Sequence, residues 1–331
     1  MRRGTTLALI AGGTLAAVAV GAVARSRMRA RQLAIPEPVT GIFPNGMAYF
    51  RWGTGPKTLL QIPGGPGNTV PSGGMALRMA RSHVRAFVED GYTVWGVARK
   101  QNMPRGHTMA DIADDYAGLI DDQFAGKVDL VVGVSYGGMV GFYLGARHPD
   151  RFGHLAICVA GYEVSERGKA LDYEFARLQS EGRNADAAAL MLQDLGPAIG
   201  VPGVTRVLGA LMGRFMFGAT HPYFASDVMV EADAEVACDA RDVLPDISVP
   251  VLLVCGDEDV YFPKDVYEET ARLIPDCTLR MYEGVGHVGT VMDKRFPMDV
   301  LDFVRQRPAT PRERGEEQQP ILGELVGTAA D

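Results

Sequence analysis

The chain has 331 residues, 47% of them hydrophobic and 22% charged, so it is long enough to bury a full core in one large domain or two small ones. The net charge of −7 gives no indication of a nucleic acid partner. Four cysteines occur without the paired spacing of a metal site, and Cys158 and Cys255 lie in apolar runs where a buried free thiol is expected.

The first 38 residues form a region of their own. Residues 5–24 carry no charge, and a stretch of this length is sufficient to span a bilayer. Four arginines follow within residues 25–31, against two before the apolar stretch, and positive charge favours the cytoplasmic side. We therefore predict a single-pass membrane anchor with the rest of the chain in the cytoplasm. The alternative is a signal peptide, cleaved after Ala22-Val23-Ala24, followed by export.

From residue 41 to residue 121 the chain alternates between strand and helix patterns. Two short apolar runs separated by Pro44-Asn45-Gly46 predict an antiparallel hairpin at a sheet edge. A later apolar run ends in Pro63-Gly64-Gly65-Pro66-Gly67-Asn68, which fits neither a helix nor a strand interior and predicts an exposed loop. The predicted strands are 41–43, 47–52, 57–62 and 92–98, and the predicted helices are 75–89 and 108–121.

Residues 128–139 contain the pattern around which the rest of the chain is organised. An apolar run enters Gly133-Val134-Ser135-Tyr136-Gly137, and small or apolar residues then recur at helical spacing. This pattern predicts a buried strand, a sharp turn and a helix, with the Ser135 hydroxyl exposed at the tip of the turn. The helix N-terminus behind Ser135 favours negative charge that develops in front of it.

The remaining chain contains further strands and a long interruption. A strand is predicted at 155–160, after which residues 162–245 predict several helices rich in Ala, Leu, Met and Phe. Alternation resumes with strands at 249–255 and 278–282 and helices at 264–273 and 296–305. Because strands and helices alternate, we predict an α/β fold with a mainly parallel twisted sheet flanked by helices.

The strand, turn and helix around Ser135 resemble the nucleophile elbow of the α/β-hydrolase superfamily. A serine nucleophile needs a base and a third group that orients the base. His287, in a glycine-rich loop after the last predicted strand, is the candidate base. The resemblance implies an acid three residues after Gly256, which selects Asp259, with Asp257 as the alternative. The order serine, aspartate, histidine is the order of this superfamily, and all three residues follow predicted strands at their carboxyl ends.

The loop at 63–67 resembles the His-Gly-Gly-Pro-Gly loop of the same superfamily. The resemblance implies an oxyanion hole that is formed by the backbone amides of Gly65 and Tyr136. This chain has Pro63 where histidine is usual. The difference affects the expected shape of the loop, whereas the expected class of reaction is unchanged.

With the resemblance, the chain divides into seven predicted segments. These are a basic segment at 1–4, a transmembrane anchor or signal at 5–24, a basic linker at 25–38, the first part of the α/β-hydrolase core at 39–161, a helical cap inserted after the sixth strand at 162–245, the second part of the core at 246–306 and a disordered tail at 307–331.

The predicted function is that of a serine hydrolase which cleaves a carboxylic ester, or a related thioester or amide, through an acyl-enzyme on Ser135. The apolar runs 207–212 and 215–217 could line an acyl pocket or pack on the core. We expect no cofactor and no metal, and the sequence does not indicate an oligomeric state. The alternatives are a proline iminopeptidase-like aminopeptidase, an acyltransferase, and a ligand-binding receptor on the same fold.

Overall fold

The computed structural model describes residues 37–67, 74–194 and 221–307. Its strands are β1 (Val39–Ile42), β2 (Ala48–Trp52), β3 (Lys57–Ile62), β4 (Tyr92–Val97), β5 (Val128–Val134), β6 (Phe152–Cys158), β7 (Val251–Gly256) and β8 (Cys277–Tyr282). Its helices are α2 (Gly74–Glu89), α3 (Met109–Gln123), α4 (Tyr136–Arg147), α5 (Glu166–Ser180), α6 (Asn184–Asp194), α8 (Phe224–Val236), α9 (Lys264–Leu273), α10 (His287–Met292) and α11 (Arg295–Gln306), with short 3₁₀ turns at Pro149–Arg151 and Leu244–Asp246.

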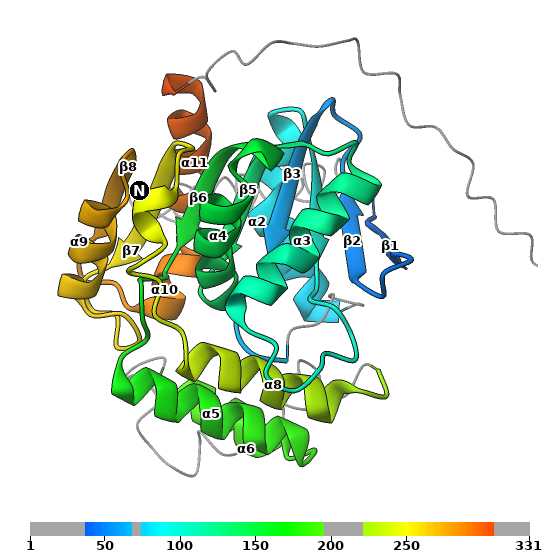
Figure 1. Ribbon diagram of the computed structural model, residues 1–331, viewed down its shortest axis with the longest axis vertical. Helices are drawn as coiled ribbons and strands as arrows, with labels where there is room; N and C mark the ends of the chain where they lie inside the picture. Colours follow the sequence, from blue (N-terminus) through cyan, green and yellow to red (C-terminus); the bar gives the residue numbers. More distant parts are fainter. Residues whose placement is uncertain (1–36, 68–73, 195–220, 308–331) are drawn as a thin grey trace, which may run out of the picture.

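The strands form one eight-stranded sheet in the order β1-β2-β4-β3-β5-β6-β7-β8 (Figure 1). The β1–β2 and β2–β4 pairs are antiparallel, and every pair from β4 to β8 is parallel. The predicted edge hairpin and the predicted mainly parallel sheet are therefore confirmed. Parallel strands need crossover connections, and the helices between them supply these crossovers and cover the sheet.

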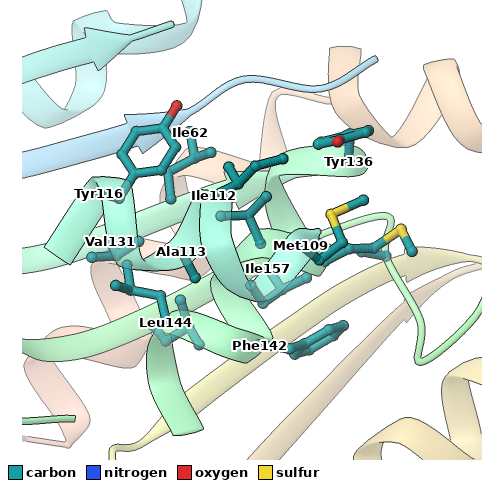
Figure 2. Close-up of a cluster of buried hydrophobic side chains, with 14 of the residues drawn as sticks. Ile62, Met109, Ile112, Ala113, Tyr116, Val131, Tyr136, Phe142, Leu144 and Ile157 are labelled. Carbon is teal, nitrogen blue, oxygen red and sulfur yellow. The ribbon is translucent and has the colours of Figure 1, made fainter. Parts of the chain in front are cut away.

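Apolar side chains bury both faces of the sheet. On one face, α3 and α4 pack over the central strands, and Figure 2 shows Ile112, Tyr116, Val131 and Phe142 in this cluster. On the other face, α2 and α11 pack against strand residues that include Leu59, Leu130 and Val132. Because the central strands are covered on both sides, their sequences are nearly continuous apolar runs rather than alternating ones.

Three described helices, α5, α6 and α8, are inserted in the chain between β6 and β7 (Figure 1). They pack on one another mainly through α5, which contacts both α6 and α8. The predicted helical insertion after the sixth strand is thus present, while its limits at residues 162 and 245 stay a prediction. The apolar runs 207–212 and 215–217 lie outside the described residues.

The predicted membrane localisation requires correction. Among the residues that the structure describes, no helix is both long enough and apolar enough to span a bilayer. A span of the hydrocarbon core needs about 20 apolar residues, whereas the longest described helix, α2, has 16 residues. The stretch 5–24, on which the predicted anchor and cytoplasmic placement rested, lies outside the described residues, as does the tail from 308 to 331.

Candidate active site

Ser135 lies at a sharp turn between β5 and α4 and has a strained backbone. Its φ of 51° and ψ of −119° lie in a region that side-chain-bearing residues rarely adopt. The turn persists because its surroundings hold it: the Ser135 amide donates a 2.8 Å hydrogen bond to the carbonyl oxygen of Cys158 on β6. A Cβ on Gly137 would lie 2.2 Å from the Ile62 carbonyl oxygen, so only glycine allows α4 to begin this close to β3.

Two hydrogen bonds connect Ser135, His287 and Asp259. The Ser135 Oγ lies 3.0 Å from His287 Nε2, and His287 Nδ1 lies 2.8 Å from Asp259 Oδ2. A carboxylate only accepts hydrogen bonds, so the network assigns the imidazole proton to Nδ1 and leaves Nε2 to accept from the serine hydroxyl. The Asp259 side chain is fully buried and that of His287 is 12% exposed, so the imidazole is partly accessible while its acidic partner is shielded.

Asp259 accepts three further hydrogen bonds that fix its orientation. The Tyr267 hydroxyl donates to Oδ2 at 2.5 Å, and the amides of Tyr261 and Phe262 donate to Oδ1 at 2.8 and 3.3 Å. The alternative acid, Asp257, accepts instead from the amide of Gly284 at 2.6 Å. Asp259 is therefore the aspartate that contacts His287.

His287 begins the short helix α10, which the sequence did not predict because a segment of six residues carries too little periodicity. Its ring packs against Tyr261, with ring centroids 4.7 Å apart, and against Phe262 at 6.0 Å. Tyr261 and Phe262 lie two and three residues after Asp259, so the loop that carries the carboxylate also packs against the imidazole.

The loop at 63–67 packs directly behind Ser135. A Cβ on Gly64 would lie 3.1 Å from the Ser135 Cβ and 2.9 Å from the Val134 carbonyl oxygen. Gly65 has a φ of 66°, the left-handed region that favours glycine. Tyr136 is the first residue of α4, where a backbone amide has no partner within its own helix. These positions are compatible with two amides that face one anionic oxygen beside Ser135.

Arg99 donates hydrogen bonds to this loop, and it was not identified as a functional residue from the sequence. Its guanidinium donates to the carbonyl oxygens of Pro63, at 3.0 Å, and of Gly65, and it lies 4.2 Å from the centre of the Tyr136 ring. Burial alone would lower the pKa of Arg99, but the charge of the adjacent Glu231 raises it above its usual value. Arg99 therefore stays charged inside the protein.

Glu231 on α8 connects the same loop to the helical insertion. Its Oε2 accepts from the Gly67 amide at 2.5 Å, and its own carbonyl oxygen accepts from the Tyr136 hydroxyl at 3.1 Å. Burial also raises the pKa of that Tyr136 hydroxyl well above its usual value, so it remains a donor. The sequence contains one signal for this role: Asp227, Glu231 and Glu235 recur every four residues on α8, and all three are buried.

The described part of the chain contains no group of three or more His, Cys, Asp or Glu side chains that could hold a metal ion. The residues around Ser135 are instead a hydroxyl, an imidazole, a carboxylate and backbone amides. This set can perform nucleophilic attack with proton transfer at a carbonyl carbon.

A family model described as the alpha/beta hydrolase family matches residues 62–299, which is most of the chain. The chain belongs to the α/β hydrolase family. This α/β hydrolase has curated relatives whose names are those of enzymes, so it is itself assigned as a hydrolase. The match includes the turn at Ser135, the loop after β7 and the start of α10, and it also includes the insertion.

Two of these relatives have named substrates. A protein named carbamate hydrolase RutD, from Yersinia enterocolitica serotype O:8, is 27% identical over 216 residues, which cover 63% of this α/β hydrolase and 73% of that protein. The pimeloyl-(acyl-carrier protein) methyl ester esterase of Neisseria meningitidis serogroup C is 27% identical over 177 residues, which cover 50% and 66% of the two chains.

Solved structures show the same fold. The enol-lactonase from Burkholderia xenovorans LB400 superposes with a TM-score of 0.62 at 19% identity, over 81% of this α/β hydrolase and all of that chain. A hydrolase from Pseudomonas aeruginosa PA01 superposes with a TM-score of 0.61 at 22% identity, over 81% and 98% of the two chains. At these identities the likeness concerns the fold and not the substrate.

Proposed function

We propose that this α/β hydrolase cleaves a carboxylic ester through an acyl-enzyme formed on Ser135. The observation that carries the proposal is the pair of hydrogen bonds from Ser135 to His287 and from His287 to Asp259. A serine hydroxyl is a weak nucleophile at neutral pH and becomes effective when a positioned base removes its proton. The 3.0 Å from Ser135 Oγ to His287 Nε2 is within the range for this proton transfer, and the 2.8 Å from His287 Nδ1 to Asp259 Oδ2 is that of a hydrogen bond that orients the ring.

In the first half-reaction, Ser135 Oγ attacks the carbonyl carbon of the ester while His287 Nε2 takes the hydroxyl proton. The amides of Gly65 and Tyr136 donate to the oxyanion of the tetrahedral intermediate. The intermediate collapses when the bond to the alcohol oxygen breaks, and His287 returns the proton to that oxygen. Asp259 holds the imidazole in the required tautomer and stabilises the imidazolium that forms.

In the second half-reaction, a water molecule attacks the acyl group on Ser135. His287 takes a proton from the water, the oxyanion forms again at the same amides, and the acid is released as Ser135 regains its proton. We infer that the helical insertion is a cap over this site, because Glu231 on α8 bonds to the loop that carries Gly65.

A carbamate is the second candidate substrate, because relatives of this chain are named carbamate hydrolases. A carbamate presents the same carbonyl carbon to Ser135, with nitrogen in place of carbon on one side. A prolyl amide would be the substrate of an aminopeptidase, and transfer of the acyl group to an alcohol would identify an acyltransferase.

Labelling with a fluorophosphonate probe tests the proposal, because the probe reacts with an activated serine and needs no knowledge of the substrate. We expect labelling of the wild type and of the control Ser226→Ala, whose exposed hydroxyl bonds to a nearby carbonyl oxygen. Ser135→Ala and His287→Ala should lose labelling, and hydrolysis of p-nitrophenyl esters should fall by a factor of about 10⁶. A folded wild type without labelling would favour a ligand-binding receptor, and full activity of His287→Ala would reject the mechanism.

The substrate class is tested with a panel that contains p-nitrophenyl esters of graded acyl length, an aryl carbamate and a prolyl p-nitroanilide. We expect the esters to give the highest kcat/KM. A higher value for the carbamate or the prolyl amide would replace the ester in the proposal, and product analysis with added alcohol would detect acyl transfer.

A further inference from the structure

The imidazole ring of His287 is held by two hydrogen bonds, one at each of its nitrogen atoms. Nε2 lies 3.0 Å from Ser135 Oγ, and Nδ1 lies 2.8 Å from Asp259 Oδ2. The N–H group and the lone pair of an imidazole lie in the plane of the ring. Two contacts in that plane leave the ring able to swing about the line through its two nitrogens. A contact on the face of the ring is therefore needed to fix its tilt.

Tyr261 supplies a contact of this kind. Its ring centroid lies 4.7 Å from that of His287, with 42° between the two ring planes. The Phe262 ring is more distant, at 6.0 Å, and nearly parallel to the imidazole at 21°. Phe262 is a core residue that also packs on Tyr267, whereas Tyr261 is only partly buried. Tyr261 is thus the nearer of the two rings.

The backbone of Tyr261 is fixed from two directions. Its amide donates to Asp259 Oδ1 at 2.8 Å, and its carbonyl oxygen accepts from the Ser165 amide at 2.8 Å. Ser165 directly precedes α5, and its hydroxyl donates to the carbonyl oxygen of Val260 at 2.7 Å. The loop that carries Tyr261 is therefore bonded both to the buried carboxylate and to the start of α5, in the helical insertion.

Helix α5 also packs directly against the Tyr261 side chain. A Cβ on Gly168, in the first turn of α5, would lie 3.0 Å from Tyr261 Cδ1 and 3.2 Å from Tyr261 Cα. Glycine at this position allows the helix to approach the tyrosine this closely. The Tyr261 ring consequently has α5 of the insertion and the imidazole of His287 as neighbours, and contact with both restricts its movement.

We propose that Tyr261 is a positioning residue for His287, an inference that rests on the proposed function of Ser135. When Ser135 Oγ attacks the ester, its proton passes to His287 Nε2 and the imidazole becomes a cation. The face of an aromatic ring attracts a cation, and more strongly where water is excluded. The His287 side chain is 12% exposed. Tyr261 therefore fixes the tilt of the imidazole and stabilises the imidazolium that forms during the reaction.

Substitutions at Tyr261 test this role by steady-state kinetics. Tyr261→Leu keeps an apolar side chain and removes the aromatic face, and we expect kcat for p-nitrophenyl esters to fall about tenfold. KM should stay within about twofold of the wild-type value, because the imidazolium exists only after proton transfer. Tyr261→Met, a second variant without a ring, should show the same loss, and Tyr261→Phe should recover most of it. The control is Tyr173→Leu, at a position of α5 that is 41% exposed, and it should keep the wild-type kcat.

Proton magnetic resonance of the resting enzyme gives a second measurement that requires no reaction. The proton on His287 Nδ1, which is hydrogen-bonded to Asp259, should give a separate low-field resonance that is absent from His287→Ala. We expect this resonance to broaden in Tyr261→Leu, because water reaches the uncovered face and the proton exchanges faster. It should stay sharp in Tyr261→Phe and in Tyr173→Leu. A role of Tyr261 in stability alone would not change this resonance in folded protein.

The two measurements separate this inference from the proposed catalysis. If the resonance broadens as expected but the wild type cleaves no ester, the proposed catalysis fails and the positioning of His287 by Tyr261 stands. If the wild type cleaves esters and Tyr261→Leu keeps both kcat and the sharp resonance, only the role of Tyr261 fails. A loss of kcat with an unchanged resonance, or an equal loss in Tyr261→Phe, would also overturn the role of the ring.

Discussion

Arg99 and Glu231 form a buried ion pair between the end of β4 and α8. Arg99 Nε lies 2.6 Å from Glu231 Oε1, and the two side chains are 1% and 5% exposed. The same two side chains bond to Pro63, Gly65 and Gly67, the loop that packs behind Ser135. The pair therefore connects the helical insertion to the candidate oxyanion loop, and its removal should affect both stability and activity.

Glu231→Ala should lower the free energy of unfolding by about 3–5 kcal/mol, because it leaves the Arg99 charge buried without its partner. Glu231→Gln, which keeps an acceptor of the same size, should cost less and should lower kcat with the fold intact. The control is Arg147→Ala, which breaks an exposed pair with Asp114 whose side chains are 49% and 40% exposed. For this control, urea denaturation should show a decrease in the free energy of unfolding of less than about 1 kcal/mol. Equal losses for the two alanine variants would contradict a special role for the buried pair.

Tyr267→Phe removes the hydroxyl that donates to Asp259 Oδ2 at 2.5 Å. A hydrogen bond to a charged group contributes about 1.5–3 kcal/mol. Without it, Asp259 should orient the His287 ring less well, and we expect part of this free energy to be lost from stabilisation of the transition state. A tenfold loss of kcat corresponds to about 1.4 kcal/mol, and a loss of about this size is expected. Tyr116→Phe is the matched control, since its buried hydroxyl donates to the Val97 carbonyl oxygen at 2.7 Å. Steady-state kinetics in which both variants keep the wild-type kcat would show that Tyr267 has no positioning role.

Two glycine-to-alanine changes should have opposite effects on the free energy of unfolding. Gly137→Ala should destabilise the fold by about 3 kcal/mol, because the added Cβ would lie 2.2 Å from the Ile62 carbonyl oxygen at the start of α4. Gly118→Ala should stabilise it by about 0.5–1 kcal/mol, since this exposed position in α3 has open space and alanine favours the helix. Thermal unfolding of both variants measures the two effects, and a tolerated Gly137→Ala would show that α4 can move away from β3.

Glu235 gives the protein a pH-dependent stability. Burial, together with the nearby Asp172 carboxyl, raises the pKa of Glu235 well above its ordinary value of 4.5. Above that ordinary value the folded state keeps a proton that the unfolded state releases, so the free energy of unfolding falls as pH rises. Glu235→Gln is neutral at every pH and should lose less stability than the wild type between about pH 5 and about pH 8.

Urea midpoints at the two pH values measure this difference, and the exposed Glu268→Gln serves as the control for the loss of a surface carboxylate. We expect Glu268→Gln to follow the wild type. Parallel pH dependences for the wild type and Glu235→Gln would mean that Glu235 is already ionised in the folded protein.

Local patterns were sufficient to predict much of the fold and the turn that carries Ser135. Hydrophobic periodicity and turn residues are properties of neighbouring positions, so the alternation of strands and helices could be predicted, as could the turn at Ser135. His287 and the pair Asp257 and Asp259 could be proposed because they follow strands at their carboxyl ends, and parallel strands end at one edge of a sheet. The choice of Asp259 over Asp257 came from the resemblance to the α/β-hydrolase superfamily. The same local reasoning was wrong about the localisation, because the described chain contains no helix that could span a bilayer.

The features that only the tertiary structure could reveal are contacts between residues that are separated in the sequence. Arg99 and Glu231 are 132 positions apart, and no periodicity indicates that two opposite charges will be buried together. The bond of Asp257 to Gly284, 27 positions away, likewise depends on how the loops after β7 and β8 meet. The hydrogen bond from Tyr267 to Asp259 depends on how α9 packs beside the loop after β7. A sequence pattern reports which face of an element is apolar, whereas contacts and cavities arise only when those faces meet.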